Sequence, residues 1–333
     1  MKKIIYGLFF LSFISSCTNE IDLFGEWENV PVVYGLIEAG SSEEYIRLEK
    51  VFRGIDGNAF DAALTADSLY YTEDAVVQIE NVTTGESTIL QKVNASETLG
   101  WDREDGLFAS DPNYLYKIDD DALTRNTGDD LRFTVTMSGE ETPLTEAVTK
   151  VIQPIDYKAP STDLISFKPD RDTRFIYEFG PNTGVFDLVI YINIDEFDLV
   201  ANEASSKSLK WIVATAENAV QAGLGLPVYE LRGDNFFSFL LGELDEDPNV
   251  IRFFKDIDVE FIAGGLELKA FNDIALANTG ITSSQEVPTY TNLSNGLGII
   301  SSKASSRVNG LDLTSDSKDL LRNSELTEKL NFE

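Results

Sequence analysis

The sequence predicts a mainly β fold, with an N-terminal immunoglobulin- or fibronectin-like β-sandwich followed by a second β-rich domain that carries a few short helices. Short runs of branched and aromatic residues alternate with regular turns in the first half, and similar runs in the second half are longer. Helical periodicity is confined to short segments. At 333 residues, 43% of them hydrophobic, the chain is globular and exceeds what one core usually serves.

Six or seven short strands are expected in the first half. "VVYGLIEA" and "EYIRLEKVF" flank the turn "GSSE", and in the second run Tyr45, Arg47 and Glu49 occupy the face opposite Ile46 and Leu48. "AVVQIENVTTGESTILQKV" has the pattern of a hairpin, and "YLYKI", "DLRFTVTMS" and "TEAVTKVI" follow. This spacing is typical of an immunoglobulin-like sandwich, although no cysteine pair bridges its sheets.

One weakly helical insertion, "RGIDGNAFDAALTADSLYYTED", interrupts these strands and carries Phe60, Tyr70 and Tyr71. Long loops with aromatic residues are either packed down locally or used for binding, and both interpretations stay open here. Trp101 lies in the polar loop "TLGWDREDG". We expect its ring to be packed, but an exposed ring could stack on a ligand.

The proline-containing stretch 153–163 places the boundary between a sandwich domain, 31–157, and a second domain, 158–333. In "VFDLVIYINIDEFDLVA", alternation puts Phe186, Leu188, Ile190 and Ile192 on one face of a long strand. "SLKWIVATAEN" favours a strand over a helix, "DNFFSFLLGEL" a short buried helix, and Gly264–Gly265 a hairpin turn. Short amphipathic helices are expected at the C-terminal end.

The N-terminus has the pattern of a lipoprotein signal. Lys2 and Lys3 precede an uncharged run too short to span a membrane, and "ISSC" ends at Cys17, the single cysteine. This resembles a bacterial lipobox, which implies a signal peptide at 1–16, a lipidated Cys17 and an acidic tether at 17–30. The alternative is an ordinary secretory signal with a stray thiol. Acyl chains on Cys17 would be the only membrane attachment.

Composition excludes several functions. The formal net charge is −31, and loss of the leader removes two further positive charges. We therefore expect no nucleic-acid partner and no electrostatic adhesion to anionic lipid. Histidine is absent, which excludes Ser-His-Asp catalysis and His-ligated zinc, so the sequence favours a protein that is not an enzyme.

Acidic clusters occur at Asp119–Asp121, Asp129–Asp130 and Asp245–Asp247. Calcium prefers such oxygen-rich loops, but none of these has the EF-hand spacing. We expect solvated surface acids and no cofactor, with calcium as the alternative.

The stretch "YTNLSNGLGIISSK", 290–303, resembles a motif near the end of a family of uncharacterised Bacteroidota outer-membrane lipoproteins. Its most specific part comprises Asn292, Asn295, Gly296 and Gly298. The lipobox, "VVYGLIEAG" and "GVFDLVIYINIDEF" carry the same resemblance. It implies a surface lipoprotein that works with an outer-membrane partner, and Glu20 and Asp22 after the cysteine resemble a surface-export signal.

From its residues alone, "SNGLGI" predicts a tight turn in which Gly298 permits a close backbone approach. A loop that offers backbone amides to a ligand is the alternative, but no phosphate-loop lysine follows the glycines.

Three functions remain to be separated. The first is a lipid-anchored, non-enzymatic accessory subunit of an outer-membrane β-barrel transport or assembly complex. The second is an autonomous surface module that binds glycans, peptides or matrix, which an aromatic groove with an exposed Trp101 would favour. The third is a carboxylate-dependent hydrolase, which needs two acids facing each other within a cleft.

Overall fold

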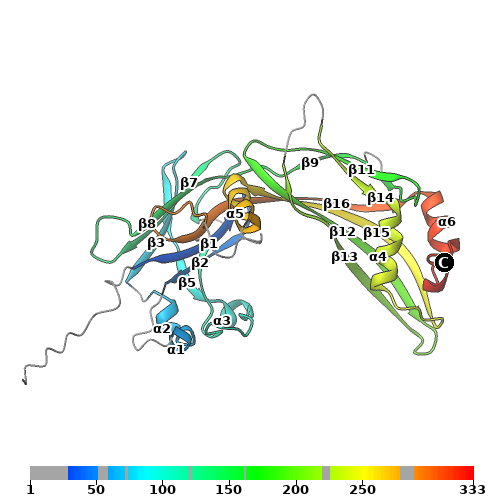
Figure 1. Ribbon diagram of the computed structural model, residues 1–333, viewed down its shortest axis with the longest axis horizontal. Coiled ribbons are helices and arrows are strands. Elements are labelled where there is room, and N and C mark those ends of the chain that lie inside the picture. The colour runs from blue at the N-terminus through cyan, green and yellow to red at the C-terminus, as the bar shows by residue number, and fades with distance from the viewer. Residues whose placement is uncertain are drawn as a thin grey trace, which may run out of the picture.

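The computed structural model describes residues 29–51, 59–71, 74–119, 122–160, 163–219, 226–277 and 289–333. The described chain is built mainly of strands, so the predicted fold class is confirmed. Figure 1 shows an elongated molecule with a sandwich at one end and the C-terminus, beside α6, at the other.

The first half forms a two-sheet sandwich. One sheet has the order β1-β2-β6-β5 and the facing sheet the order β4-β3-β7-β8. These strands are β1 (Pro31–Ile37), β2 (Glu43–Lys50), β3 (Ala75–Asn81), β4 (Glu86–Ile89), β5 (Gln91–Asn94), β6 (Tyr114–Asp119), β7 (Asp130–Met137) and β8 (Thr145–Lys150). Lettered along the chain, the sheets read A-B-E-D and C′-C-F-G, the order of an immunoglobulin-like domain. The predicted sandwich is confirmed by this strand order.

Alternation along each strand builds the core between the sheets. Ile46 and Leu48 of β2 are buried there, and Tyr45, Arg47 and Glu49 lie on the outer face, as their spacing predicts.

The second half is a sandwich of a different kind. Its main layer is an antiparallel sheet with the order β13-β12-β15-β16, and a small sheet, β14-β11-β9, contributes to the same core with two helices. The elements are β9 (Asp156–Ala159), β10 (Leu164–Ile165), β11 (Asp172–Glu178), β12 (Thr183–Asp198), β13 (Glu203–Asn218), β14 (Val228–Arg232), α4 (Gly233–Glu243), β15 (Val250–Gly265), β16 (Leu297–Leu313), α6 (Ser315–Asn323) and η2 (Glu328–Leu330). The predicted strand at β13, the buried helix α4 and the inward face of β12 are confirmed.

The hairpin expected at Gly264–Gly265 is wrong. The two glycines end β15, and α5 (Leu266–Ala277) begins directly after them and folds back over the long sheet. A Cβ at Gly264 would lie 2.6 Å from Leu268 Cδ2 and 3.0 Å from Val185 Cγ2, so this glycine gives the helix room to pack closely against the strands. The stretch expected to be a linker also contains β9.

Strand β16 joins the two halves. Its first residues pair in parallel with β1, from Val32↔Leu297 to Ile37↔Ser302, and its later residues pair antiparallel with β15. The result is one nine-stranded sheet that continues from the first sandwich into the second. Because Leu293 and Ile300 belong to the first core, the structure departs from a simple division of the chain near residue 157.

A buried ion pair holds the C-terminal residues. Arg252 Nε lies 2.8 Å from Glu196 Oε1, and the Arg252 guanidinium also donates to the Leu330 carbonyl at 2.7 Å. Burial alone would raise the pKa of Glu196, but hydrogen bonds from Lys207 and Arg252 outweigh it and hold that pKa below its usual value.

Gly298 is the residue on which the β1–β16 pairing depends most directly. Its φ is +97°, and a Cβ would lie 1.9 Å from the Val33 carbonyl oxygen. Gly298→Ala is therefore expected to lower the free energy of unfolding by about 3–5 kcal/mol, from backbone strain and a forced separation of the strands. Urea unfolding followed by circular dichroism measures this change.

Gly310→Ala is the matched control, since Gly310 lies in the same strand at φ +74° with nothing within 4 Å of its Cβ position. It should cost only the left-handed conformation, about 1–2 kcal/mol. Equal losses in the two variants would contradict the close approach.

Candidate functional site

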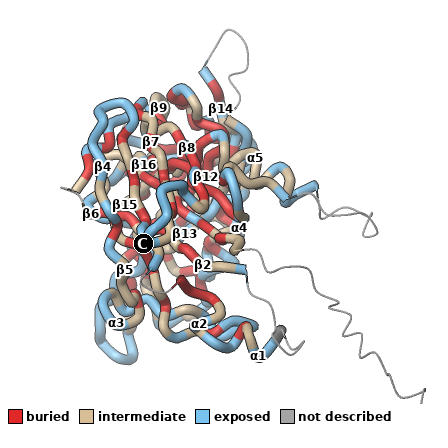
Figure 2. The backbone as a smooth tube through the Cα atoms, turned by 90° about the vertical axis from the view of Figure 1, so that its left-hand side faces the viewer, coloured by how far each residue is buried: buried red, intermediate tan, exposed pale blue. Residues whose placement is uncertain are grey.

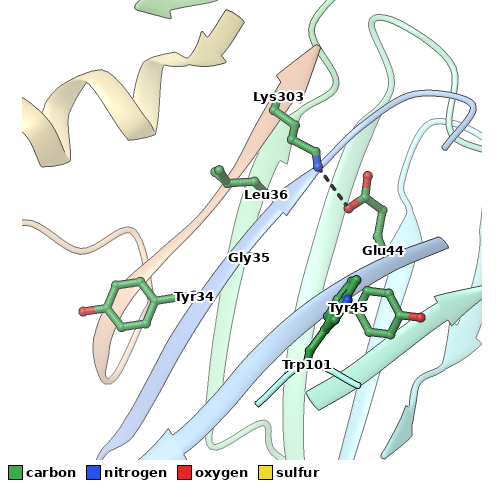
Figure 3. A pocket seen from close by; sticks show the side chains of 7 residues that line it. All are labelled: Tyr34, Gly35, Leu36, Glu44, Tyr45, Trp101 and Lys303. Carbon is green, nitrogen blue, oxygen red and sulfur yellow. Dashed lines mark ion pairs between the residues drawn. The ribbon is translucent and has the colours of Figure 1, made fainter. Parts of the chain in front are cut away.

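An open groove of about 350 Å³ lies on the outer face of the first sandwich, where β1, β2 and β16 meet. Figure 3 shows Tyr45 and Trp101 side by side, Tyr34 separate from them on β1, and the Glu44–Lys303 ion pair nearby. The groove is lined by Tyr34, Gly35, Leu36, Glu44, Tyr45, Trp101 and Lys303. Pockets of this size commonly hold small ligands.

The backbone of Trp101 is fixed before any ligand arrives. The short helix α3 (Ala95–Leu99) ends at Gly100, whose φ of +68° turns the chain, and Trp101 N donates to the Ala95 carbonyl at 3.1 Å. The Trp101 carbonyl accepts from Asn113 Nδ2 at 2.8 Å. Trp101 is therefore preorganised, which reduces the entropy lost when a ligand binds.

An ion pair and a hydrogen bond hold this region against β2. Arg103 NH1 lies 2.8 Å from Glu49 Oε1, and Arg47 NH2 donates to Asn113 Oδ1 at 2.9 Å. The outward side chains of β2 therefore contact the segments next to Trp101 and hold its backbone in place.

Three aromatic residues line the groove. Tyr45 meets Trp101 edge-on, with ring centroids 5.0 Å apart, and donates its phenol to Glu43 Oε2 at 2.6 Å. Burial and this hydrogen bond raise the pKa of Tyr45 to about 12, so its phenol stays neutral. Trp101 is 51% exposed and Tyr34 is 45% exposed, which leaves apolar ring surface available for contact.

An ion pair between Glu44 and Lys303 lies at one end of the groove. Glu44 is 5% exposed, accepts from Glu38 N at 3.1 Å, and lies 3.7 Å from Lys303 Nζ. Burial raises the pKa of Glu44, while the positive charge of Lys303 opposes that rise.

Glu38 also approaches Lys303, at 3.9 Å, but it does not line the groove. Glu38 Oε1 accepts from both the amide and the hydroxyl of Ser305, at 2.9 and 2.8 Å. The two carboxylates therefore both bind residues of β16. Glycoside hydrolysis instead requires two carboxylates that face the substrate from opposite sides.

The four aromatic residues considered for binding differ in exposure. Tyr70 and Tyr71 are 4% exposed, and Tyr70 packs edge-on against Tyr114. Phe60 is exposed on α1 and does not line the groove. Trp101, expected to be packed, has half of its surface exposed, so that expectation is wrong.

Tyr34 and Lys303 were not singled out from the sequence. Tyr34 could have been found from its outward position in the alternating run "VVYGLIEA". Lys303 had no such signal, because only the pairing of β16 with β1 brings it to the groove.

The family-like motif is accounted for by the fold. Asn292 Nδ2 donates to the Ile300 carbonyl at 2.7 Å, and Asn292 Oδ1 accepts from Ile300 N at 3.1 Å. Asn295 Nδ2 donates to the Leu144 carbonyl at 3.3 Å. Gly296, at φ +132°, and Gly298 provide the turn and the close approach, so these residues join β16 to the first sandwich.

Acidic clusters that were expected to be solvated are only partly so. Asp129 is buried and accepts from Asn81 Nδ2 at 2.7 Å and from Asn126 N at 2.9 Å, so the expectation is wrong at that position. Its role is to fix the turn before β7. Within the described ranges, no group of three or more acidic or cysteine residues could hold a metal ion.

Cys17, the leader, most of the tether and Asp120–Asp121 lie outside the described residues. In the part of the chain that the structure describes, no helix combines the length and the apolar character needed to cross a membrane.

Comparison with known proteins gives little further guidance. No protein-family model matches the chain, and no curated protein matches its sequence. A crystal structure of the FN1–FN3 domains of chicken CNTN1 aligns at 8% identity with a TM-score of 0.18, over 70% of this chain and 59% of that one. The immunoglobulin-like assignment rests on strand order.

Glu44→Gln tests the electrostatics of the groove. The folded-state pKa of Glu44 lies above its reference value of 4.5, so ionisation of the buried carboxyl costs stability above that folded pKa. The variant should melt at a higher temperature than the wild type at neutral pH. The difference should shrink as the pH falls through the folded pKa, and vanish below about pH 4. Calorimetry across this pH range measures it.

Glu196→Gln is a control of opposite sign, because the pKa of Glu196 is lowered. That variant should be less stable than the wild type at neutral pH, and its deficit should diminish in acid. A pH-independent difference for Glu44→Gln would show that its burial carries no such cost.

Proposed function

We propose that this protein is a lipid-anchored, non-enzymatic surface protein of a bacterial outer membrane that binds an uncharged glycan in the aromatic groove. The observation that carries the proposal is the half-exposed ring of Trp101, on a backbone held by hydrogen bonds to Ala95 and Asn113. Flat apolar rings beside a few polar groups suit the apolar faces and hydroxyls of a sugar.

The net negative charge of the chain favours an uncharged ligand over an anionic one. A chain of net charge −31 disfavours an anionic polysaccharide, and Lys303, the cation at the groove, is already shared by Glu38 and Glu44. An extended peptide is the competing ligand, since aromatic grooves also take peptides.

Trp101→Ala should weaken binding of short neutral oligosaccharides at least tenfold, which corresponds to about 1.4 kcal/mol, because a stacking surface is lost. Isothermal titration calorimetry, after a glycan-array screen with the wild type, measures it. Trp101→Phe should retain part of the affinity.

The matched control is Phe253→Ala, which removes a 43% exposed aromatic ring from the second half of the chain and should leave binding unchanged. Wild-type protein that binds peptides but no neutral glycan would overturn the ligand class. Equal losses in Trp101→Ala and Phe253→Ala would overturn the site.

The proposed location depends on Cys17. Mass spectrometry of the protein from its own bacterium should find residues 1–16 removed and acyl chains on Cys17. Cys17→Ser should move the protein from the membrane fraction to a soluble one, since acyl chains supply the attachment. An unmodified Cys17 in the mature wild-type chain would exclude the lipid anchor.

A second candidate function is an accessory subunit of an outer-membrane β-barrel transport or assembly complex. The family resemblance supports it, and one structural observation favours it: large apolar side chains are exposed on the segments about α1 and α3, at the end of the molecule opposite the C-terminus. Co-purification of a barrel protein with the full-length chain tests this role.

A further inference from the structure

An exposed apolar surface lies beside the first sandwich, where α1 (Ala59–Ala63) and α2 (Ala66–Leu69) lie near the loop that follows α3. Its four large apolar residues are between 43% and 67% exposed. We call them the apolar tip: Phe60, Leu64, Leu107 and Phe108. Figure 2 shows α1, α2 and α3 projecting beyond the sheets.

Backbone hydrogen bonds bring the two segments of the apolar tip together. Ala109 N donates to the Ala63 carbonyl at 2.8 Å, which places Leu64 and Phe108 on either side of the same hydrogen bond. Leu64 N donates to the Phe60 carbonyl at 3.2 Å, so these two side chains lie one helical turn apart on the same face.

A small core supports this surface from below. Leu69, Tyr70 and Ala109 are packed together with less than a tenth of their surface exposed. The apolar tip is therefore supported by buried side chains of the same two segments.

The two segments that carry the apolar tip are strongly acidic. Segments 59–69 and 101–110 contain five exposed acids against one base, Arg103, which is paired with Glu49 and lies over the Phe108 ring. The acids are Asp61, Asp67, Asp102, Glu104 and Asp105.

The tip lies at the end of the molecule that the lipid anchor would hold. Tyr71, which follows α2 closely, donates its phenol to Asn29 Oδ1 at 2.7 Å, so the first described residue contacts this region. About 12 residues separate Cys17 from Asn29, roughly 40 Å when fully extended. The C-terminus lies at the opposite end (Figure 1).

We infer that the apolar tip docks onto an integral outer-membrane protein whose exposed surface presents an apolar depression ringed by lysine and arginine. This rests on the accessory role proposed above. An apolar centre with a charged rim is the usual anatomy of a transient interface, and a basic rim complements the five acids. The same acids are repelled by anionic headgroups, which disfavours the bilayer as the occupant.

Site-specific photo-crosslinking in the intact producing bacterium tests this inference. The full-length chain carries p-benzoylphenylalanine at Leu64 or Leu107, which are 63% and 65% exposed. The control position is Val200, 79% exposed in the turn between β12 and β13, near the C-terminal end of the molecule. Both tip positions should give one discrete adduct with an integral outer-membrane protein, and Val200 should not.

Mass spectrometry of the adduct should place the crosslink within a lysine- or arginine-rich surface of the partner. Leu64→Asp and Leu107→Asp should reduce co-purification of that partner at least tenfold without changing the melting curve, because both side chains are exposed. Binding should also weaken as salt is raised.

Adducts with a second copy of this chain, with lipid, or with no protein at either tip position would overturn the inference. If a barrel protein co-purifies with the wild type but the tip gives no adduct, the accessory role stands and this surface is wrong. If no barrel protein co-purifies, the role itself fails.

Discussion

The backbone pairing of β16 with two different partners is the constraint on which the rest of the structure depends. Its first half extends the sheet of the first sandwich through β1, and its second half extends the long sheet through β15. The pairing brings Ile300 into the first core and Lys303 to the end of the groove. The fold and the candidate site are therefore set by one strand, and that strand can approach β1 only because residue 298 has no side chain.

Features that depend only on residues close together in the sequence could be predicted from it. The alternation of Ile46 and Leu48 with outward residues, and the inward row of β12, follow from a period of two, which is a local property. The helix α4 follows from its dense apolar run. Pairing across most of the chain leaves no local signal, so the role of β16 in the first sandwich and the position of Lys303 could not be derived.

The candidate site was predictable only in part, for a related reason. Trp101 stood out as an aromatic residue in a polar loop, but its backbone is positioned by hydrogen bonds to Ala95 and Asn113 that the sequence does not reveal. Tyr70 and Tyr71 had the same composition signal and are buried. The pair Gly264–Gly265 indicated a turn, yet glycine serves there to admit Leu268 of an adjacent helix. The composition of a segment identifies candidate site residues, and the packing of the folded chain determines which of them are exposed.

The shared strand has a consequence for how the protein is made. A ribosome releases β1 early and β16 near the end, so the first sandwich cannot be completed until most of the second half has been synthesised. Until then the edge of β1 is an unfilled template for pairing with another chain. When two unfinished chains meet, strand exchange between them competes with correct closure. Folding of this protein should therefore depend on protection of the β1 edge until β16 has been synthesised.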